Sequence, residues 1–471
     1  MFLPLDRDEG AYAYVGWAWL TGKGIPYSSF FDHKTPLAYL LYGLAGTIGN
    51  NTFLAVRIFS LIYVLTIIIL FYLLISRLHT KIVAVLSTLT LAIYLSSISL
   101  EGSNFNTEVV MLLPLLGFIF LIWKQSARQR NRLGLFLTGF LGGIAILAKP
   151  SAVVVIVVSA LWFLMRVKSP KKLTMMIIGI LIPLAISIAY FYSQGQIGAL
   201  FSSVVTYNRL YISEGLREEY IYKTSGFGGI PGHLIWLIRV PSILIPLLLA
   251  AIVGAFFEIR RNKNLALFIG LLIFSSLAAI KMAGAREFPH YYISPVLPLC
   301  IGLASFLNHL IKAKRAIWAL VLTALMISLV FLSEYHIWRS GPAAIQKSQF
   351  NEGGLFGAAP ILGKWIRENI GPEEKILVMA NEPEIYYYAQ RLSPTKYIYI
   401  YPLELLEKEK TKWEKCVEGN PPDWLITNKI DPQAANFSQK FLSKNHSYSL
   451  YTTFGNYLIY SRVNKKSIGI K

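Results

Sequence analysis

Charged residues and cysteines are scarce in this chain of 471 residues. Asp, Glu, Lys and Arg make up only 15% of the sequence, whereas hydrophobic residues make up 55%, and the mean hydropathy is +0.51. So little charge excludes an ordinary soluble domain and is typical of a polytopic membrane protein. The two cysteines, Cys300 in an apolar run and Cys416 in a polar segment, indicate neither a disulfide framework nor a thiolate metal site.

Acidic residues are the scarcer of the two charges. The chain has 25 Asp and Glu against 45 Lys and Arg, for a formal net charge of +20. Such an excess can indicate nucleic-acid binding, but Lys and Arg are also enriched in the cytoplasmic loops of membrane proteins. Here the basic residues gather in alternate loops between apolar runs. We therefore expect that these basic residues face the anionic surface of a lipid bilayer and that the protein binds no nucleic acid.

Ten apolar runs approach the length that spans a bilayer. We predict a mostly α-helical, polytopic membrane protein with about ten spans. The run from Pro36 to Gly49 is only about fourteen residues long, which suits a short re-entrant or interfacial helix. The predicted spans are residues 53–76, 82–100, 107–123, 133–148, 150–166, 173–192, 233–257, 264–280, 290–310 and 315–333.

The positive-inside rule orients these spans. Five short loops rich in Lys and Arg are expected in the cytoplasm, so the complementary loops and everything after residue 333 face outward. Ten of the eleven carboxylates before residue 334 fall in or beside outward loops, Glu258 being the exception. The outer face of the cell membrane is thus expected to carry the acidic residues, including those of the first loop, residues 1–52.

In this topology the first loop begins on the outer side with no signal before it. We expect that a first transmembrane helix is missing and that residues 1–4 are the outer end of it. The alternative is that ten spans suffice and that the short amino terminus crosses unaided.

The composition changes near Glu334, which predicts a transmembrane domain over residues 1–333 and a second domain over residues 334–471. Short apolar runs at 375–379, 423–427 and 457–460 are typical of buried strands, and the stretches around 361–369 and 384–391 of helices. We predict a small extracytoplasmic α/β domain of about 130 residues. It has no glycine-rich turn after a strand, so neither a phosphate loop nor a dinucleotide site is indicated.

The first forty residues hold the densest group of polar residues. Asp6, Asp8 and Glu9 lie within four residues, and Asp32-His33-Lys34 follows them. A carboxylate can accept the proton of an attacking hydroxyl, and a neighbouring cation can neutralise a departing phosphate. The cations expected on the outward side are Lys34, Arg57, Lys149, Arg286 and His290.

These residues form a recognisable pattern within residues 1–333. The Asp8-Glu9 pair is followed by Tyr12, and Lys34 leads through Pro36 into the short apolar stretch; the other elements are Asn51 and Arg57 opening a long span, Leu147-Ala148-Lys149, and His290-Tyr291-Tyr292 with Pro295 and Pro298. The pattern resembles membrane glycosyltransferases of the GT-C superfamily, in the group of protein mannosyltransferases and aminoarabinose transferases.

The resemblance implies transfer of a sugar from a polyprenyl-phosphate donor to a lipid, glycan or protein acceptor at the outer membrane face, with inversion at the anomeric carbon. Asp8 is the implied general base, and Glu9 orients its loop. Asp32 or His33 stands where the relatives carry an acidic residue near the lysine. The implied substrate-binding residues are Lys34, Arg57, Lys149, Arg286, His290, Asp32 and Tyr12. No ligand cluster compels a metal, so no metal ligand is predicted and a divalent cation is left open.

Structural explanations stand beside these roles. The first three carboxylates could form a solvated turn, Arg57 and Lys149 could reach the lipid headgroups, and His290 could be an interfacial histidine. Glu108, with Glu101 close by, could line the cavity or cap a helix that begins after Thr107, and we favour the cap. The aromatic residues Tyr12, Tyr14, Trp17 and Trp19 are interpreted as an interfacial belt.

Two other functions stay open as alternatives. A transporter or flippase of a lipid-linked sugar would place ionisable groups near the middle of its spans and show two similar halves. The predicted spans are nearly free of charge, and no internal repeat is evident. A non-catalytic subunit or receptor would not need the acidic first loop.

Overall fold

The computed structural model describes residues 3–49, 52–126, 131–223, 240–282, 288–341, 344–345 and 355–463. The chain forms two compact units. The first unit contains Met1–Phe59, Gln196–Tyr207 and Ser340–Lys471, and the second contains Ser60–Gly195 and Asn208–Arg339. This division groups the first loop with the tail, whereas the sequence analysis places a boundary near residue 333; the predicted domains stay a prediction.

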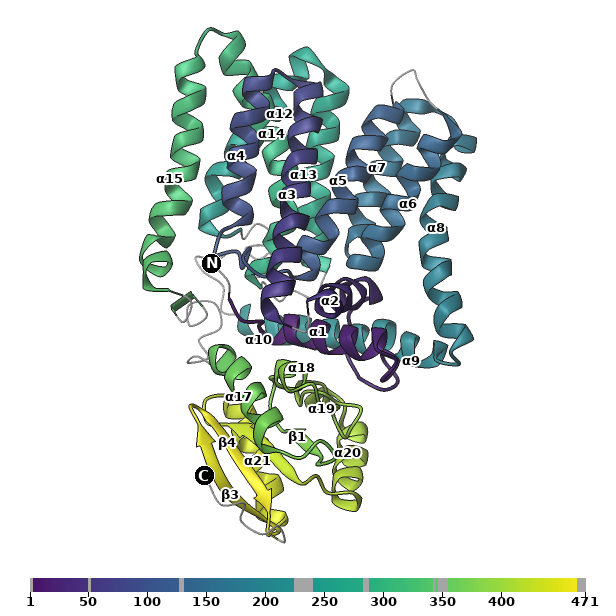
Figure 1. The fold of residues 1–471 in the computed structure, drawn as a ribbon. Helices are drawn as coiled ribbons and strands as arrows, with labels where there is room; N and C mark the ends of the chain where they lie inside the picture. Colours follow the sequence, from purple (N-terminus) through teal and green to yellow (C-terminus); the bar gives the residue numbers. More distant parts are fainter. Residues whose placement is uncertain are drawn as a thin grey trace. The chain divides into compact units, whose positions relative to one another are not determined.

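The second unit is built from helices in its described residues (Figure 1). Helix α3 begins in the first unit and continues into the second. The helices are α3 (Phe53–Leu78), α4 (Lys81–Leu95), α5 (Thr107–Ser126), α6 (Arg132–Ala148), α7 (Ala152–Val167), α8 (Pro170–Ser193), α10 (Asn208–Lys223), η2 (Ser242–Leu244), α12 (Ile245–Arg261), α13 (Lys263–Met282), η3 (Pro289–Tyr292), α14 (Ile293–Lys312) and α15 (Ala316–Ser340).

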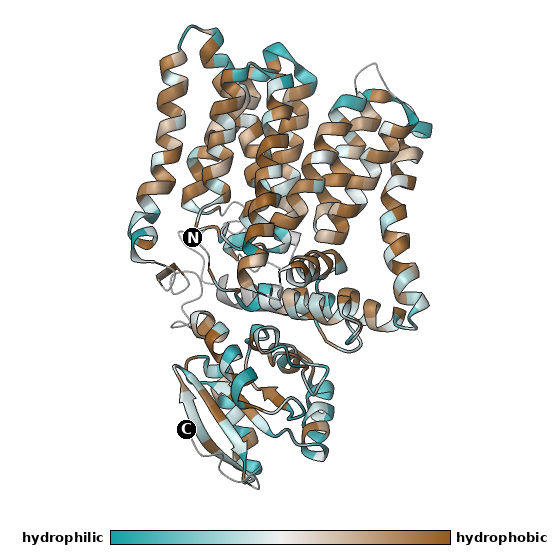
Figure 2. Cartoon of the chain, in the orientation of Figure 1, coloured by the Kyte–Doolittle hydropathy of each residue, from teal (hydrophilic) through white to brown (hydrophobic). Residues whose placement is uncertain are grey.

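The predicted spans largely coincide with helices. Residues 233–239 lie outside the described residues, and the span predicted over residues 82–100 is too long, because its helix ends at Leu95 and a loop follows. Seven helices in the described part of the chain are long and apolar enough to cross a membrane: α3, α5, α8, η2 with α12, α13, η3 with α14, and α15. Helices α4, α6 and α7 are apolar but have only 15, 17 and 16 residues. Figure 2 shows these helices as mainly hydrophobic. A polytopic membrane protein is confirmed; the count of ten spans stays a prediction.

Helices of the second unit pack through close backbone approaches. A Cβ atom at Gly302 of α14 would overlap Ala251 of α12, and one at Gly254 of α12 would overlap the backbone of α14. Small residues at helix contacts are the usual packing device in membranes. In the most apolar stretches of α3, α8 and α15, only 17–22% is buried inside the protein, as expected for helices that face lipid.

The first unit combines helices with a small sheet. Its short helix α2 matches the predicted short apolar helix, whose place at the membrane surface stays a prediction. The elements are α1 (Arg7–Leu20), α2 (Pro36–Ile48), the start of α3, α9 (Ile197–Phe201), η1 (Ser202–Tyr207), α17 (Leu355–Asn369), β1 (Ile376–Val378), α18 (Glu384–Ala389), α19 (Tyr401–Leu405), α20 (Glu407–Gly419), β2 (Trp424–Asn428), α21 (Pro432–Lys444), β3 (Tyr448–Phe454) and β4 (Tyr457–Arg462).

The sheet of the tail has the strand order β1-β2-β4-β3. Strands β1 and β2 are parallel, and β4 pairs antiparallel with β2 and with β3. The three strands predicted from apolar runs are β1, β2 and β4. Strand β3 was missed because it lies at the sheet edge, has no buried residue and leaves Leu450 52% exposed, so it has no apolar run to reveal it.

Helices α1 and α2 cross with their backbones almost touching. A Cβ atom at Gly43 of α2 would lie 2.5 Å from the carbonyl oxygen of Gly16 in α1, and one at Gly16 would overlap the backbone of α2. On the other side of α1, Gly10 leaves room for the backbone of Glu384 at the start of α18. These small residues let α1 lie between α2 and α18 within the first unit.

We predict that Gly43→Ala destabilises the protein by about 1–3 kcal/mol, because the added methyl forces α1 and α2 apart. Gly270→Ala is the matched control: Gly270 is also helical, but nothing lies within 4 Å of its added Cβ atom, so stability should be unchanged or rise by up to about 1 kcal/mol. Thermal unfolding of both variants in detergent measures the difference. Equal melting temperatures would contradict the close crossing.

Candidate functional site

A capping box fixes two of the three early carboxylates at the start of α1. The backbone N–H of Glu9 donates to Asp6 Oδ1 over 2.8 Å, and that of Asp6 donates to Glu9 Oε2 over 3.3 Å. This reciprocal arrangement satisfies two backbone donors that the first helical turn leaves without partners. Asp6 is 3% exposed and Glu9 is fully buried. The solvated-turn explanation is therefore wrong for these two residues.

Glu9 also forms an ion pair with Arg57, from the first turns of α3. The guanidinium donates to both carboxylate oxygens, over 2.6 and 2.7 Å, and to the carbonyl oxygens of Leu3 and Pro4 over 2.7 and 2.9 Å. Tyr42 of α2 donates a further hydrogen bond of 3.0 Å to Glu9. Arg57 is only 6% exposed. It therefore fixes the chain before α1 instead of acting as an exposed anchor for headgroups.

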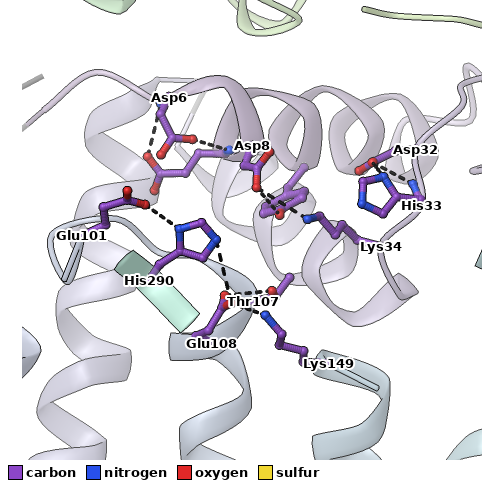
Figure 3. A network of polar contacts seen from close by, with 12 residues as sticks. Asp6, Asp8, Asp32, His33, Lys34, Glu101, Thr107, Glu108, Lys149 and His290 are labelled. Atoms are coloured by element: carbon purple, nitrogen blue, oxygen red, sulfur yellow. Dashed lines mark hydrogen bonds and ion pairs between the residues drawn. The ribbon is translucent and has the colours of Figure 1, made fainter. Parts of the chain in front are cut away.

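Asp8 differs from its two neighbours because its side chain is 40% exposed. The hydroxyl of Tyr12, one turn later in α1, donates to Asp8 Oδ2 over 3.3 Å. Lys34 Nζ lies 3.6 Å from the same oxygen (Figure 3). A lysine at this distance favours the ionised carboxylate. Asp8 is thus accessible, as a proton acceptor must be, and lies beside a positive charge.

Asp32 is held inside the first unit. Its Oδ1 accepts from the His33 backbone and from Tyr399 of the tail, over 2.7 and 2.9 Å, and its Oδ2 accepts from Tyr39 over 2.9 Å. Burial would raise the pKa of Asp32, but the hydrogen bonds and charge of His33, with the charge of Lys34, outweigh it and lower the pKa. Burial and the Lys34 charge lower the pKa of His33. Asp32 is therefore an ionised anchor for the loop.

The tail completes the surroundings of α1 within the first unit. The backbone N–H of Leu5 donates to the Tyr388 hydroxyl over 3.0 Å, and that of Ser393 donates to the Tyr14 hydroxyl over 2.8 Å. The backbone N–H of Phe31 donates to the Lys396 carbonyl over 2.7 Å. The segment around α18 and the stretch after it therefore shape the first loop. We call this group of side chains the first cluster: Asp6, Asp8, Glu9, Tyr12, Asp32, His33, Lys34 and Arg57.

A second cluster lies in the second unit and contains Glu101, Thr107, Glu108, Lys149 and His290. His290 Nδ1 lies 2.5 Å from Glu101 Oε2, and its Nε2 lies 3.9 Å from Glu108 Oε1. Lys149 forms an ion pair with the same Glu108 oxygen, and Figure 3 shows the His290 ring between the two carboxylates. Glu101 and Glu108 are 5% and 1% exposed. Two basic side chains and two carboxylates thus alternate in one network.

Aromatic and backbone contacts support this second cluster. The Tyr291 ring lies beneath Lys149 Nζ, 4.1 Å from ring centroid to nitrogen, which favours the cation. Glu101 has a φ of +54°, in the left-handed region that non-glycine residues rarely adopt. Thr107 donates to Glu108 over 3.0 Å. Such strain is typical of functional loops.

The structure brings most predicted site residues into these two clusters. Arg286 lies outside the described residues, as does Asn51. Tyr12, Tyr14 and Trp17 are buried inside the first unit, so they do not form an interfacial belt. For Glu108 sequence reasoning favoured a helix cap over a place lining the cavity, and it did not predict the contacts of Glu101 and Glu108 with His290 and Lys149. The available signal was that both carboxylates lie at the edge of apolar runs, where a carboxylate needs a partner. In the described part of the chain, no group of three or more His, Cys, Asp or Glu could hold a metal ion.

Comparisons with known proteins show what this chain is similar to. Residues 33–191 match the family model described as dolichyl-phosphate-mannose-protein mannosyltransferase. No curated protein matches the chain. The match, together with the similar folds below, confirms the predicted resemblance to GT-C superfamily membrane glycosyltransferases.

Three solved structures illustrate the shared fold. ArnT from Cupriavidus metallidurans, bound to undecaprenyl phosphate, is 12% identical with a TM-score of 0.60, covering 98% of this chain and 95% of its own. AglB, an oligosaccharyltransferase from Archaeoglobus fulgidus in complex with an inhibitory peptide and a dolichol-phosphate, is 13% identical with a TM-score of 0.53, covering 98% and 71%. The arabinofuranosyltransferase AftD from Mycobacteria is 11% identical with a TM-score of 0.53, covering 98% of this chain but only 38% of its own.

We predict that Arg57→Met destabilises the protein by about 3–5 kcal/mol, because it leaves the Glu9 carboxylate buried without its cation. The double variant Glu9→Gln/Arg57→Met should recover most of this loss. Arg77→Met is the control at the other end of α3, where the arginine lies over the Phe120 ring, and it should cost less than about 1 kcal/mol. Thermal unfolding in detergent measures all three; a double variant no more stable than Arg57→Met would contradict the ion pair.

Proposed function

We propose that this protein transfers a sugar from a polyprenyl-phosphate donor to an acceptor hydroxyl at the outer face of the membrane. Transfer is an inverting single displacement, with Asp8 as the general base. The alternative of a lipid-linked-sugar transporter accounts less well for an exposed carboxylate beside a lysine in the first loop.

The donor class is supported by the fold and by what its neighbours hold. The ArnT structure contains undecaprenyl phosphate, and the AglB structure contains a dolichol-phosphate. Both are lipid phosphates, and the matched family model is described by a dolichyl-phosphate sugar donor. A protein with this fold and with membrane helices has access to such a donor directly from the bilayer. The sugar is a hexose or a pentose, and the acceptor is a lipid, a glycan or a protein.

The exposure of Asp8 carries the assignment of the base. Asp6, Glu9 and Asp32 are each at most 3% exposed, and the hydrogen bonds described above use their oxygens to hold the backbone or a tyrosine. The Asp8 side chain is 40% exposed. Among the four carboxylates of the first cluster, Asp8 is therefore the one that a substrate hydroxyl can reach.

The chemistry of the step follows from this carboxylate. Asp8 accepts the proton of the acceptor hydroxyl while the hydroxyl oxygen bonds to the anomeric carbon from the side opposite the phosphate. The bond between that carbon and the phosphate oxygen breaks, and the lipid phosphate leaves with the electron pair. A phosphate needs no proton to leave once its charge is neutralised, unlike the alcohol released by glycosidases, which use two carboxyl groups. One accessible carboxylate is therefore sufficient.

Lys34, Lys149 and His290 are the basic residues that we propose for neutralising the phosphate. Lys149 and His290 are held at defined positions by Glu108 and Glu101, and Lys34 lies beside Asp8. Preorganised cations stabilise charge where it develops. Arg57 was predicted as a phosphate ligand, but its hydrogen bonds to Glu9, Leu3 and Pro4 favour a role in holding the loop. The bonds of Asp32 to Tyr39 and Tyr399 favour the same role.

We predict that Asp8→Asn leaves the protein folded but lowers sugar transfer by at least about a hundredfold, the usual contribution of a general base. Asp6→Asn is the matched control two residues away: asparagine caps a helix as well as aspartate, so this variant should keep near wild-type transfer. The assay uses proteoliposomes with a radiolabelled polyprenyl-phosphate sugar and chromatography of the products.

The same assay separates the two functions. A transferase forms a new glycoside that Asp8→Asn fails to form, whereas a transporter moves the labelled lipid across the bilayer without a new product. Wild-type transfer by Asp8→Asn would refute the assignment of the base.

Lys149→Met should raise the KM for the lipid-phosphate donor by about tenfold or more, because a charge-assisted hydrogen bond to the phosphate is lost. The KM for the acceptor should stay unchanged. Lys171→Met, which removes an exposed lysine at the start of α8, is the control and should leave both constants unchanged. An unaltered donor KM in Lys149→Met would exclude Lys149 from the phosphate site.

A further inference from the structure

Glu334 is a fully buried carboxylate on the last turns of α15. It accepts four hydrogen bonds: Oε1 from the Ser97 hydroxyl and the Ser99 backbone over 2.6 and 2.9 Å, and Oε2 from the Ile98 backbone and Trp338 Nε1 over 2.9 and 3.3 Å. No lysine or arginine pairs with it in the described part of the chain. A buried charge of this kind is tolerated only where donors replace water.

Three of the four donors belong to the loop between α4 and α5. The same loop carries Glu101, whose backbone N–H donates to the carbonyl of Ile98 over 2.9 Å. The backbone N–H of Gly102 donates to the carbonyl of Ser97 over 2.8 Å. Ser97 and Ile98, which donate hydrogen bonds to Glu334, therefore also accept the backbone hydrogen bonds that form the turn at Glu101. Glu101, in turn, holds His290 Nδ1 at 2.5 Å.

We propose that Glu334 is a positioning residue for sugar transfer, which acts by fixing the loop that sets Glu101 against His290. The proposal rests on the proposed function for its effect on the reaction. The strained φ of Glu101 supports it, because a non-glycine residue stays in the left-handed region only where its surroundings hold it there. Glu334 is distant in sequence from the first loop and matches none of the residues that carry the family resemblance.

Glutamine is the informative replacement because it keeps the shape of the side chain. Both oxygens of Glu334 accept from two donors each. The NH₂ group of a glutamine at this position would face the Ser99 N–H in one orientation, and the N–H groups of Ile98 and Trp338 in the other, where an acceptor is needed. Glu334→Gln therefore removes at least one hydrogen bond to the loop without creating a cavity. Ser97→Ala is a second, milder variant, which removes one loop donor and leaves the carboxylate in place.

The test is a double-mutant cycle with Glu101→Gln, measured as kcat/KM for the lipid-phosphate donor. Each single variant should lose about tenfold, as is usual when a residue that orients a functional group is removed, and the double variant should lose no more than either single one. Val330→Ala is the control: Val330 is buried one turn earlier on α15, so this variant loosens the helix without touching the loop, and its effect should multiply with that of Glu101→Gln.

Hydrogen exchange of residues 97–104 gives a readout that does not depend on the reaction. Exchange should become faster in Glu334→Gln and in Ser97→Ala but not in Val330→Ala. If Glu334→Gln does not fold, the cycle is carried out with Ser97→Ala. Multiplied losses in the double variant, or unchanged loop exchange, would overturn the positioning role. Absence of transfer by the wild-type protein would overturn the proposed function, while faster loop exchange in Glu334→Gln would still support the placement of Glu101 by Glu334.

Discussion

The ion pair between Glu9 and Arg57 is the interaction on which the first unit depends. A carboxylate and a guanidinium removed from water are tolerated only when their hydrogen-bonding capacity is met, and here Tyr42 and the backbone before α1 meet it. The pair connects the start of α1 to the start of α3, and the hydrogen bond from Tyr42 connects α2 to the same carboxylate. Asp8 stands one residue before Glu9, so the direction of its side chain follows from this fixed neighbour.

The buried and the exposed acidic residues have different contacts. The carboxylates of Asp6, Glu9 and Asp32 are enclosed and hold the loop, whereas Asp8 meets solvent. In the second unit, Glu101 and Glu108 are enclosed and hold Lys149 and His290. These carboxylates thus serve mainly to place other groups, and the exposed Asp8 is the one to which the proposed function assigns the chemistry. This division suits a protein in which charge is rare, because each buried charge requires its own set of donors.

The sequence alone predicted what depends on local pattern. The apolar runs became helices, Pro36 began the short helix, and three strands of the tail were found from their buried cores. Strand β3 was missed since an exposed edge strand has no apolar alternation. The pairing of Glu9 with Arg57, of Asp32 with Tyr399, and of Glu334 with Ser97 could not be predicted, because contacts between residues 48 to 367 positions apart depend on the packing of helices and not on periodicity. The family pattern named Arg57 and Asp32, but only their contacts reveal that they hold the loop.

The first unit brings the first loop into contact with the tail. Leu5 and Asp32 form hydrogen bonds with Tyr388 and Tyr399, over sequence separations of 383 and 367 residues. During synthesis, the partners of the early segment do not exist until the chain has been made as far as Tyr388 and Tyr399. Closing so long a loop makes this assembly slow. A ribosome-bound or truncated chain can thus insert its helices while still lacking an organised first loop, and Asp8, the base in the proposed function, would take its place only after the tail has been made.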